Sequence, residues 1–230
     1  PDKTKFGQQT GLDHFIVGAD QLSEGIGGMK VGLVARDGAF GFATFTPDKS
    51  HGYLCSRSAL QRHYGAEIGR ARSAGWYMYR SFRADGAEIH GDGAKEFKKV
   101  AKFLGIQYRP STPHTPNSNA LHERFMQVFG DGIRVALFQA GLPMQFWPLA
   151  GQYFETAYNC TVVQSHGKTA YAARYPLKSA PSLHPFGCLV TYVPLAGHRR
   201  KFESRAVPAV FLGHNPQPGG LVSSEFRVIP

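Results

Sequence analysis

The sequence is poor in cysteine and contains no long apolar segment. Its three cysteines, Cys55, Cys160 and Cys188, lie far apart, and such a scattered, odd-numbered set forms neither a disulfide framework nor a paired zinc motif. No signal peptide is recognisable, and no apolar run approaches the roughly 18 residues of a membrane-spanning helix. We therefore expect a protein of a reducing intracellular compartment rather than a secreted or membrane-embedded one.

Acidic residues are also scarce. The 230 residues include 16 aspartates and glutamates against 26 lysines and arginines, which gives a formal net charge of +10. This excess favours a polyanionic partner, although solubility alone can explain part of it. Hydrophobic residues make up 42% and aromatic residues 13% of the chain, which is enough for one sizeable domain and a small appendage.

The order of the predicted elements is typical of the α/β class. Three β-rich segments come first, the last two joined by a hairpin turn, and helices and strands then alternate. An amphipathic helix with its lysines on one side precedes the last of these strands. The predicted strands are 11–17, 29–35, 39–46, 76–84 and 106–109, and the predicted helices are 53–66, 93–104, 120–140 and 144–158.

The composition changes after residue 165. Short β-rich segments at 186–193, 209–213 and 226–229 alternate there with turns and scattered basic residues. We therefore expect two units, a core of residues 1–165 and a small β-rich C-terminal module of residues 166–230.

Three carboxylates lie where chemistry is plausible. Asp13 shares a strand face with apolar residues, where a charge is costly unless it is paired or bound to metal. Asp85 follows the predicted strand 76–84, and clefts in α/β folds lie at the carboxyl ends of strands. Glu123 falls in the first turn of the predicted helix 120–140. Acids brought together from distant parts of a chain repel one another, so they indicate a site for Mg²⁺.

Each of these acids also has a structural explanation. Asp13 fits an ordinary salt bridge at a strand end, and an aspartate before a glycine, as at Asp85, is common in turns. Glu88 is able to reach the same site as Asp85, but we expect it to be structural. Asp92, which precedes an amphipathic helix, is a weaker candidate.

The glutamate helix is expected to expose a polar stripe. Helical spacing turns Leu121, Phe125 and Val128 toward the core, while Glu123 points outward with other polar groups. His122 belongs to the polar residues that this helix offers to DNA. A stripe of this kind is also typical of solvated surface.

Four segments together resemble the integrase core of copia-type retrotransposon polyproteins. They are FGQQTGLDH (6–14), RADGAEI (83–89), PHTPNSNALHER (113–124) and AGLPMQFW (140–147). Two later segments, PFGCLV (185–190) and AVFLGH (209–214), resemble those that follow the core in the same polyproteins. The resemblance therefore extends over nearly the whole chain.

The resemblance implies a ribonuclease-H-like fold, with a mixed five-stranded sheet flanked by helices. It also implies a catalytic triad of Asp13, Asp85 and Glu123 that holds two Mg²⁺ or Mn²⁺ ions and catalyses DNA end processing and strand transfer. The family's interval between the last two acids is in the mid-thirties, and here 37 residues, 86 to 122, intervene. The expected partners are DNA and further copies of the chain, without a membrane or small-molecule cofactor, and the expected location is the nucleus.

DNA would be held mainly through its phosphates, by basic side chains. The candidates lie on the amphipathic helix, at the end of the strand that follows it, on the glutamate helix and in a basic cluster near the C-terminus. They are Lys95, Lys98, Lys99, Arg109, Arg124, Arg134, Arg199, Arg200 and Lys201.

Two departures from the family pattern leave alternatives open. The family usually has Asp-Asn-Gly at the second acid, where this chain has Asp85-Gly86-Ala87, and Asn-Gly before the last acid, where this chain has Asn119-Ala120. A catalytically silent domain that keeps the fold and binds DNA or a protein is therefore the main alternative to an active integrase. A ribonuclease H shares the fold but normally gathers a fourth acid.

Overall fold

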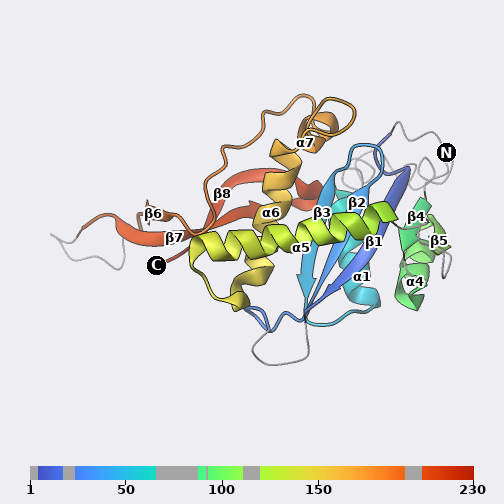
Figure 1. Cartoon of the computed structure of the whole chain (residues 1–230), viewed down its shortest axis with the longest axis horizontal. Helices are drawn as coiled ribbons and strands as arrows, with labels where there is room; N and C mark the ends of the chain where they lie inside the picture. Colours follow the sequence, from blue (N-terminus) through green and yellow to red (C-terminus); the bar gives the residue numbers. More distant parts are fainter. Residues whose placement is uncertain (1–4, 18–23, 66–87, 92, 111–119, 195–203) are drawn as a thin grey trace.

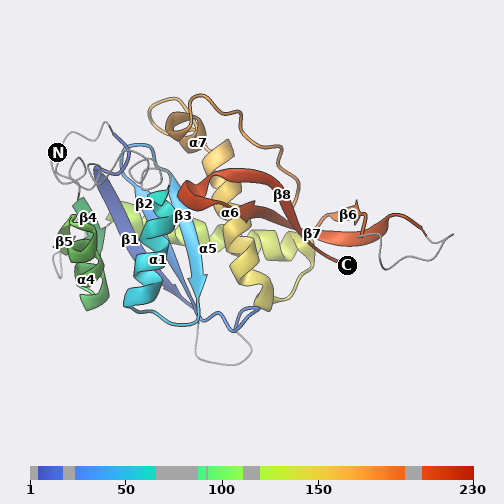
Figure 2. The ribbon, with the colours of Figure 1, turned by 180° about the vertical axis from the view of Figure 1, so that it is seen from behind.

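The structure is a computed structural model, and it describes residues 5–17, 24–65, 88–91, 93–110, 120–194 and 204–230. Within these ranges the chain forms a five-stranded mixed sheet and a three-stranded sheet. Helix α5 crosses one face of the larger sheet in Figure 1, and helix α1 covers the opposite face, which is turned to the front in Figure 2.

The strand order in the larger sheet is β3-β2-β1-β4-β5. The pairs β1–β2 and β2–β3 are antiparallel, whereas β4 is parallel to both β1 and β5. This mixed five-stranded sheet confirms the expected ribonuclease-H-like fold class. Its strands are β1 (Gln9–Ile16), β2 (Val31–Asp37), β3 (Ala43–Asp48), β4 (Glu88–Gly91) and β5 (Gln107–Pro110).

Two apolar cores lie on the two faces of this sheet. One is formed with α1 and α4, and Leu12 and Ile89 bring β1 and β4 into it. The other is formed with α5 and α6, and it includes Phe45 of β3. The helices are α1 (Tyr53–His63), α4 (Lys95–Leu104), α5 (Ala120–Ala140), α6 (Trp147–Thr161) and the short α7 (Ala170–Arg174), with a 3₁₀ turn η2 (Met144–Phe146) before α6.

Helix α4 follows directly from the sequence pattern. Phe97, Val100 and Leu104 are buried, while the lysines between them are exposed. The helix ends at Gly105, whose φ of 69° lies in the left-handed region that favours glycine. The predicted helix over 93–104 is therefore confirmed, with its start two residues later.

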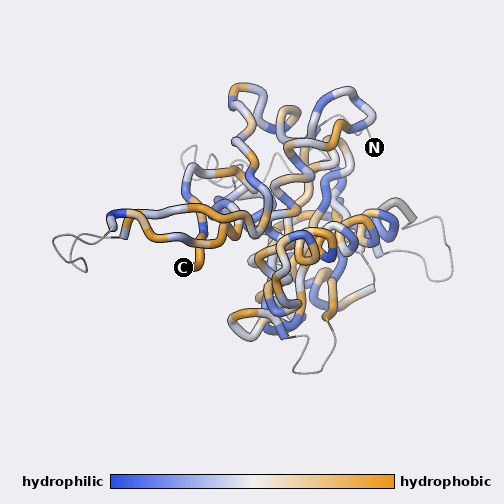
Figure 3. Tube along the Cα trace, turned by 60° about the vertical axis from the view of Figure 1, so that its left-hand side comes forward, coloured by the Kyte–Doolittle hydropathy of each residue, from blue (hydrophilic) through white to orange (hydrophobic). Residues whose placement is uncertain are grey.

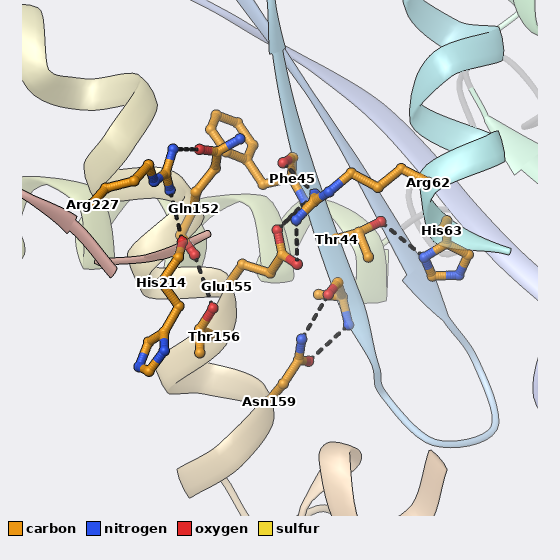
Figure 4. Close-up of polar contacts among 11 residues, drawn as sticks. Thr44, Phe45, Arg62, His63, Gln152, Glu155, Thr156, Asn159, His214 and Arg227 are labelled. Atoms are coloured by element: carbon orange, nitrogen blue, oxygen red, sulfur yellow. Dashed lines mark hydrogen bonds and ion pairs between the residues drawn. The ribbon is translucent and has the colours of Figure 1, made fainter. Parts of the chain in front are cut away.

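Side chains occupy the free edge of β3. Asn159 of α6 donates to the carbonyl oxygen of Ala43 at 2.7 Å and accepts from its amide at 2.9 Å. Two residues further along, the amide of Phe45 donates to Glu155 at 2.8 Å and its carbonyl accepts from Arg62 at 2.6 Å (Figure 4). An edge strand presents such unpaired groups to other chains, so these side chains take the place of a neighbouring strand.

An ion pair completes this edge. Two nitrogens of Arg62 each lie 2.9 Å from an oxygen of Glu155, in a bidentate arrangement that joins α1 to α6. Burial raises the pKa of Glu155, while Arg62 and the Phe45 amide oppose that rise. The pair is a structural feature of the fold, since it is enclosed between α1, β3 and α6 (Figure 4).

The C-terminal part contains the expected short strands. They form an antiparallel sheet in the order β6-β7-β8, with β6 (Leu189–Tyr192), β7 (Val207–Pro216) and β8 (Val222–Ile229). Phe186 and Leu212 are buried in the core beneath α5 and α6, and Arg227 donates to Gln152 of α6 at 2.6 Å. The boundary at residue 165 stays a prediction, because apolar packing continues across it.

Apolar segments of the described chain are short. Hydrophobic stretches, coloured orange in Figure 3, occur on the strands near the C-terminus and alternate with hydrophilic ones on the helices. None of the helices in the described ranges is long and apolar enough to cross a membrane.

Candidate functional site

Asp13 lies on the face of β1 that α5 covers. Strand alternation puts Gly11, Asp13 and Phe15 on one face, and Phe15 packs in the core beneath α5 and α6. Gly11 also faces α5, because a Cβ added to it would lie 2.6 Å from Nδ1 of His122. Leu12, on the other face, is buried beneath α1 and α4. The half-buried Asp13 side chain is therefore directed toward the helix that carries Glu123.

Glu123 is exposed in the first turn of α5. The residue before it, His122, points inward to Gly11, so Glu123 is next to the contact between α5 and β1. The structure thus places two of the three predicted catalytic acids on facing elements. The third, Asp85, lies outside the described residues.

The buried face of α5 differs from the predicted one. Phe125 is buried as expected, but Val128 is 45% exposed and His122 is only 7% exposed. The expectation for Val128, and the assignment of His122 to the DNA-facing surface, were therefore wrong. His122 lies three residues before Phe125 and seven before Phe129, which is buried too. That helical spacing was the signal in the sequence, but the polarity of histidine concealed it.

His122 is electrically neutral at pH 7. Burial, and then the positive charge of Arg36, lower its pKa to about 4. Arg36 is the register partner of Gly11 on β2, and its guanidinium lies 4.8 Å from the centre of the Phe125 ring. Nε2 of His122 is buried and has no hydrogen-bond partner among the described residues.

Strand β4 is the neighbour of β1 on the side opposite β2. It is parallel to β1, with Glu88 beside Gln9 and Gly91 beside Leu12. In the sequence this strand begins three residues after Asp85 and is followed by Asp92. The predicted strand 76–84 and both of these aspartates lie outside the described residues.

Glu88 has structural partners. It is 5% exposed, and its carboxylate lies 2.7 Å from the Arg109 guanidinium and 3.1 Å from Nε2 of His90. The structural explanation of Glu88 is therefore the better one. The same ion pair engages Arg109, one of the predicted DNA contacts.

The other predicted DNA contacts divide into three groups. Lys95, Lys98 and Lys99 are exposed on α4 and make no salt bridge to a described residue. Arg124 is exposed on α5, and Arg134 pairs with Asp131 one turn away. The remaining candidates lie outside the described residues, and they are Arg199, Arg200 and Lys201.

The described part of the predicted site fits a hard divalent cation in its chemistry. Asp13 and Glu123 offer carboxylate oxygens, which Mg²⁺ and Mn²⁺ prefer to nitrogen or sulfur. Within the described ranges no group of three histidine, cysteine, aspartate or glutamate side chains is placed to hold a metal ion.

The sequence is similar to a known retrotransposon polyprotein. Over 169 residues, 70% of the chain, the sequence is 25% identical to the retrovirus-related Pol polyprotein from transposon TNT 1-94 of Nicotiana tabacum. The match spans 11% of that polyprotein, so the chain corresponds to a small part of it. The chain is related to the integrase core of copia-type retrotransposon polyproteins. The predicted resemblance is thereby confirmed, although no family model matches the sequence.

Two solved structures from retroviral integrases align with this chain. A chain of the simian T-cell lymphotropic virus intasome in complex with PP2A regulatory subunit B56 gamma aligns with a TM-score of 0.49 and 17% identity, over 97% of this chain and 76% of that one. The catalytic core domain of BIV integrase aligns with a TM-score of 0.47 and 16% identity, over 72% of this chain and 91% of that one.

Proposed function

We propose that this copia-type core catalyses metal-dependent DNA end processing and strand transfer. The placement of Asp13 on β1 beneath α5, whose first turn bears Glu123, is the observation that supports this most directly. Two Mg²⁺ or Mn²⁺ ions, when bound, would activate the attacking oxygen and stabilise the leaving oxygen of a phosphodiester. Asp13, Glu123 and a second aspartate would hold these ions.

The chain offers two candidates for that second aspartate. Family resemblance and the interval before Glu123 favour Asp85. The strand register favours Asp92, because Leu12 is beside Gly91 and the next residues in the sequence are Asp13 and Asp92. Neighbouring strands lie about 4.8 Å apart, so residues in register are close enough to share a metal ion.

The length of chain between Asp85 and Glu88 also favours Asp92. Glu88 is beside Gln9, and Asp13 lies four residues further along β1, about 13 Å away at roughly 3.3 Å per residue. Asp85 precedes Glu88 by three residues, which span at most about 11 Å. Asp85 would have to fold back along the strand to reach Asp13, whereas Asp92 would not.

A strand-transfer assay with labelled duplex ends and a plasmid target, in Mg²⁺ or Mn²⁺, tests the proposal. Asp13→Asn and Glu123→Gln should each abolish product while the circular dichroism spectrum stays native. Of Asp85→Asn and Asp92→Asn, the one that removes a ligand should do the same. Asp131→Asn changes an exposed acid on the same helix as Glu123 and is the matched control. Product retained by Glu123→Gln would exclude this site.

The alternative function is a silent domain that binds DNA or a protein without catalysis. The replacement of the family's glycine by Ala120, at the start of α5, favours it, because glycine gives the backbone more freedom there. Metal affinity separates the two functions, since a silent scaffold has no need for two divalent ions. DNA binding without product and without Mn²⁺ affinity would support the silent domain.

A further inference from the structure

We infer that His122 is a positioning residue: its contact with Gly11 sets the separation of β1 and α5, and with it the approach of Glu123 to Asp13. The inference rests on the proposed function for its catalytic consequence. Its geometry rests on described residues alone.

The imidazole ring lies directly on the backbone of Gly11. A Cβ added there would be 2.6 Å from Nδ1, 3.1 Å from Cε1 and 3.2 Å from Cγ of His122. Any side chain at position 11 would therefore have to displace the ring or the helix. Glycine is required here for close approach, because its φ is not in the left-handed region.

This contact lies next to both acids in the sequence. Gly11 precedes Asp13 by two residues on the same strand face, and His122 precedes Glu123 by one residue on α5. A change in the separation of β1 and α5 at this contact therefore moves the two carboxylates relative to each other. A misplacement of about 1 Å in a catalytic group can reduce the rate on the order of 100-fold.

Arg36 is close enough to the ring to lower the pKa of His122. Arg36, opposite Gly11 on β2, extends over the Phe125 ring one turn further along α5. The buried Nε2 of His122 lacks a described partner, so an apolar side chain of similar size would be expected to stabilise the fold more. A histidine at this position therefore favours a role in the site over a role in stability alone.

A compensation experiment tests the inference. Gly11→Ala should push the ring away, lower strand transfer at least about tenfold and weaken Mn²⁺ binding, measured by calorimetry, with a native circular dichroism spectrum. His122→Ala in the same chain removes the ring that the new methyl group meets. The double variant should therefore recover product and Mn²⁺ affinity toward those of His122→Ala alone.

Crystal structures of the three variants measure the separation of β1 and α5 without any need for activity. The inference predicts a wider separation in Gly11→Ala and its reversal in the double variant. If Gly11→Ala keeps full activity, or if the double variant is no better than Gly11→Ala, the inference is overturned while the proposed function stands. If the separation responds as predicted but the native protein makes no product and binds no Mn²⁺, the positioning contact stands and the proposed function fails.

Discussion

Asn159 of α6 makes both hydrogen bonds that Ala43, on the edge strand β3, directs away from the sheet. Glu155, one helical turn earlier, accepts from Phe45, two residues further along the strand. Four residues of a helix advance about 6 Å and two residues of a strand about 6.7 Å. The two spacings match, so a helix along the edge satisfies successive outward-facing backbone groups of β3.

This relationship predicts that Asn159→Leu is strongly destabilising. The substitution keeps the size of the side chain but leaves the amide and carbonyl groups of Ala43 buried without partners. At about 1–3 kcal/mol for each unsatisfied group, the unfolding free energy should fall by roughly 2–6 kcal/mol in urea denaturation. Thr161→Ala, which removes an exposed hydroxyl from the end of the same helix, should change it by less than about 0.5 kcal/mol. A loss no larger than that of the control would show that the edge does not depend on Asn159.

The buried His63 should make the folded protein less stable as the pH is lowered. The ring is fully buried and shares a 2.9 Å hydrogen bond with Thr44, and burial, followed by Arg174 and Arg62, lowers its pKa well below 6.5. Below pH 6.5 the unfolded chain takes up a proton that the folded chain refuses. The contribution of His63 is therefore complete above pH 6.5 and is lost as the pH falls toward the folded pKa.

Urea denaturation at several values between pH 7.5 and 5 measures this dependence. One proton bound only by the unfolded state gives a slope of about 1.4 kcal/mol per pH unit. His63→Asn should lower the slope by up to this amount. Any loss of stability that does not depend on pH would leave the slope unchanged. Equal slopes for the native protein and the variant would mean that His63 binds a proton as readily in the folded state as in the unfolded state.

The sequence predicts those elements whose structure is determined by a pattern within one segment. Helices α4 and α5 lie where periodicity predicted them, because their apolar stripes are long and each pattern is contained within one segment. Strand β4 was missed because its four residues include Glu88 and His90, and burial of Glu88 depends on Arg109 of a different strand. Pairing across the sheet decided the structure at this point, and local propensity did not.

At the candidate site, too, local features were predictable and contacts between distant segments were not. The sequence singled out Asp13 and Glu123 as candidates, since each has a distinctive local setting, and their catalytic role stays a prediction. Helical spacing with Phe125 and Phe129 was a local signal that His122 is buried. Its contact with a glycine on β1, more than 100 positions away, could not be predicted from a local pattern. Choosing between Asp85 and Asp92 likewise requires the register of two strands, which no local pattern contains.

The exposed lysines of α4 predict a strong salt dependence of DNA binding. Each phosphate contact contributes about −0.9 to the slope of log K against log salt concentration. If Lys95, Lys98 and Lys99 all contact duplex DNA, changing the three to glutamine should reduce the slope by about 2.7. Fluorescence anisotropy between 50 and about 200 mM salt measures it. Arg134→Gln should have a smaller effect, because Asp131 already pairs with this arginine. An unchanged slope in the triple variant would place the DNA elsewhere.

Divalent metal should stabilise the native protein and not the acid variants. A ligand that binds only the folded state raises the unfolding free energy by about 2.7 kcal/mol at a hundredfold excess over its dissociation constant. Asp13→Asn and Glu123→Gln each remove the mutual repulsion of the acids, so the metal-free variants should stay folded. Both should lose most of the increase in melting temperature that Mn²⁺ causes in the native protein. Asp131→Asn should keep the increase, since this acid pairs with Arg134 on the exposed side of α5. An increase that persists in Glu123→Gln would place the ion away from the proposed site, and no increase in the native protein would favour the silent domain.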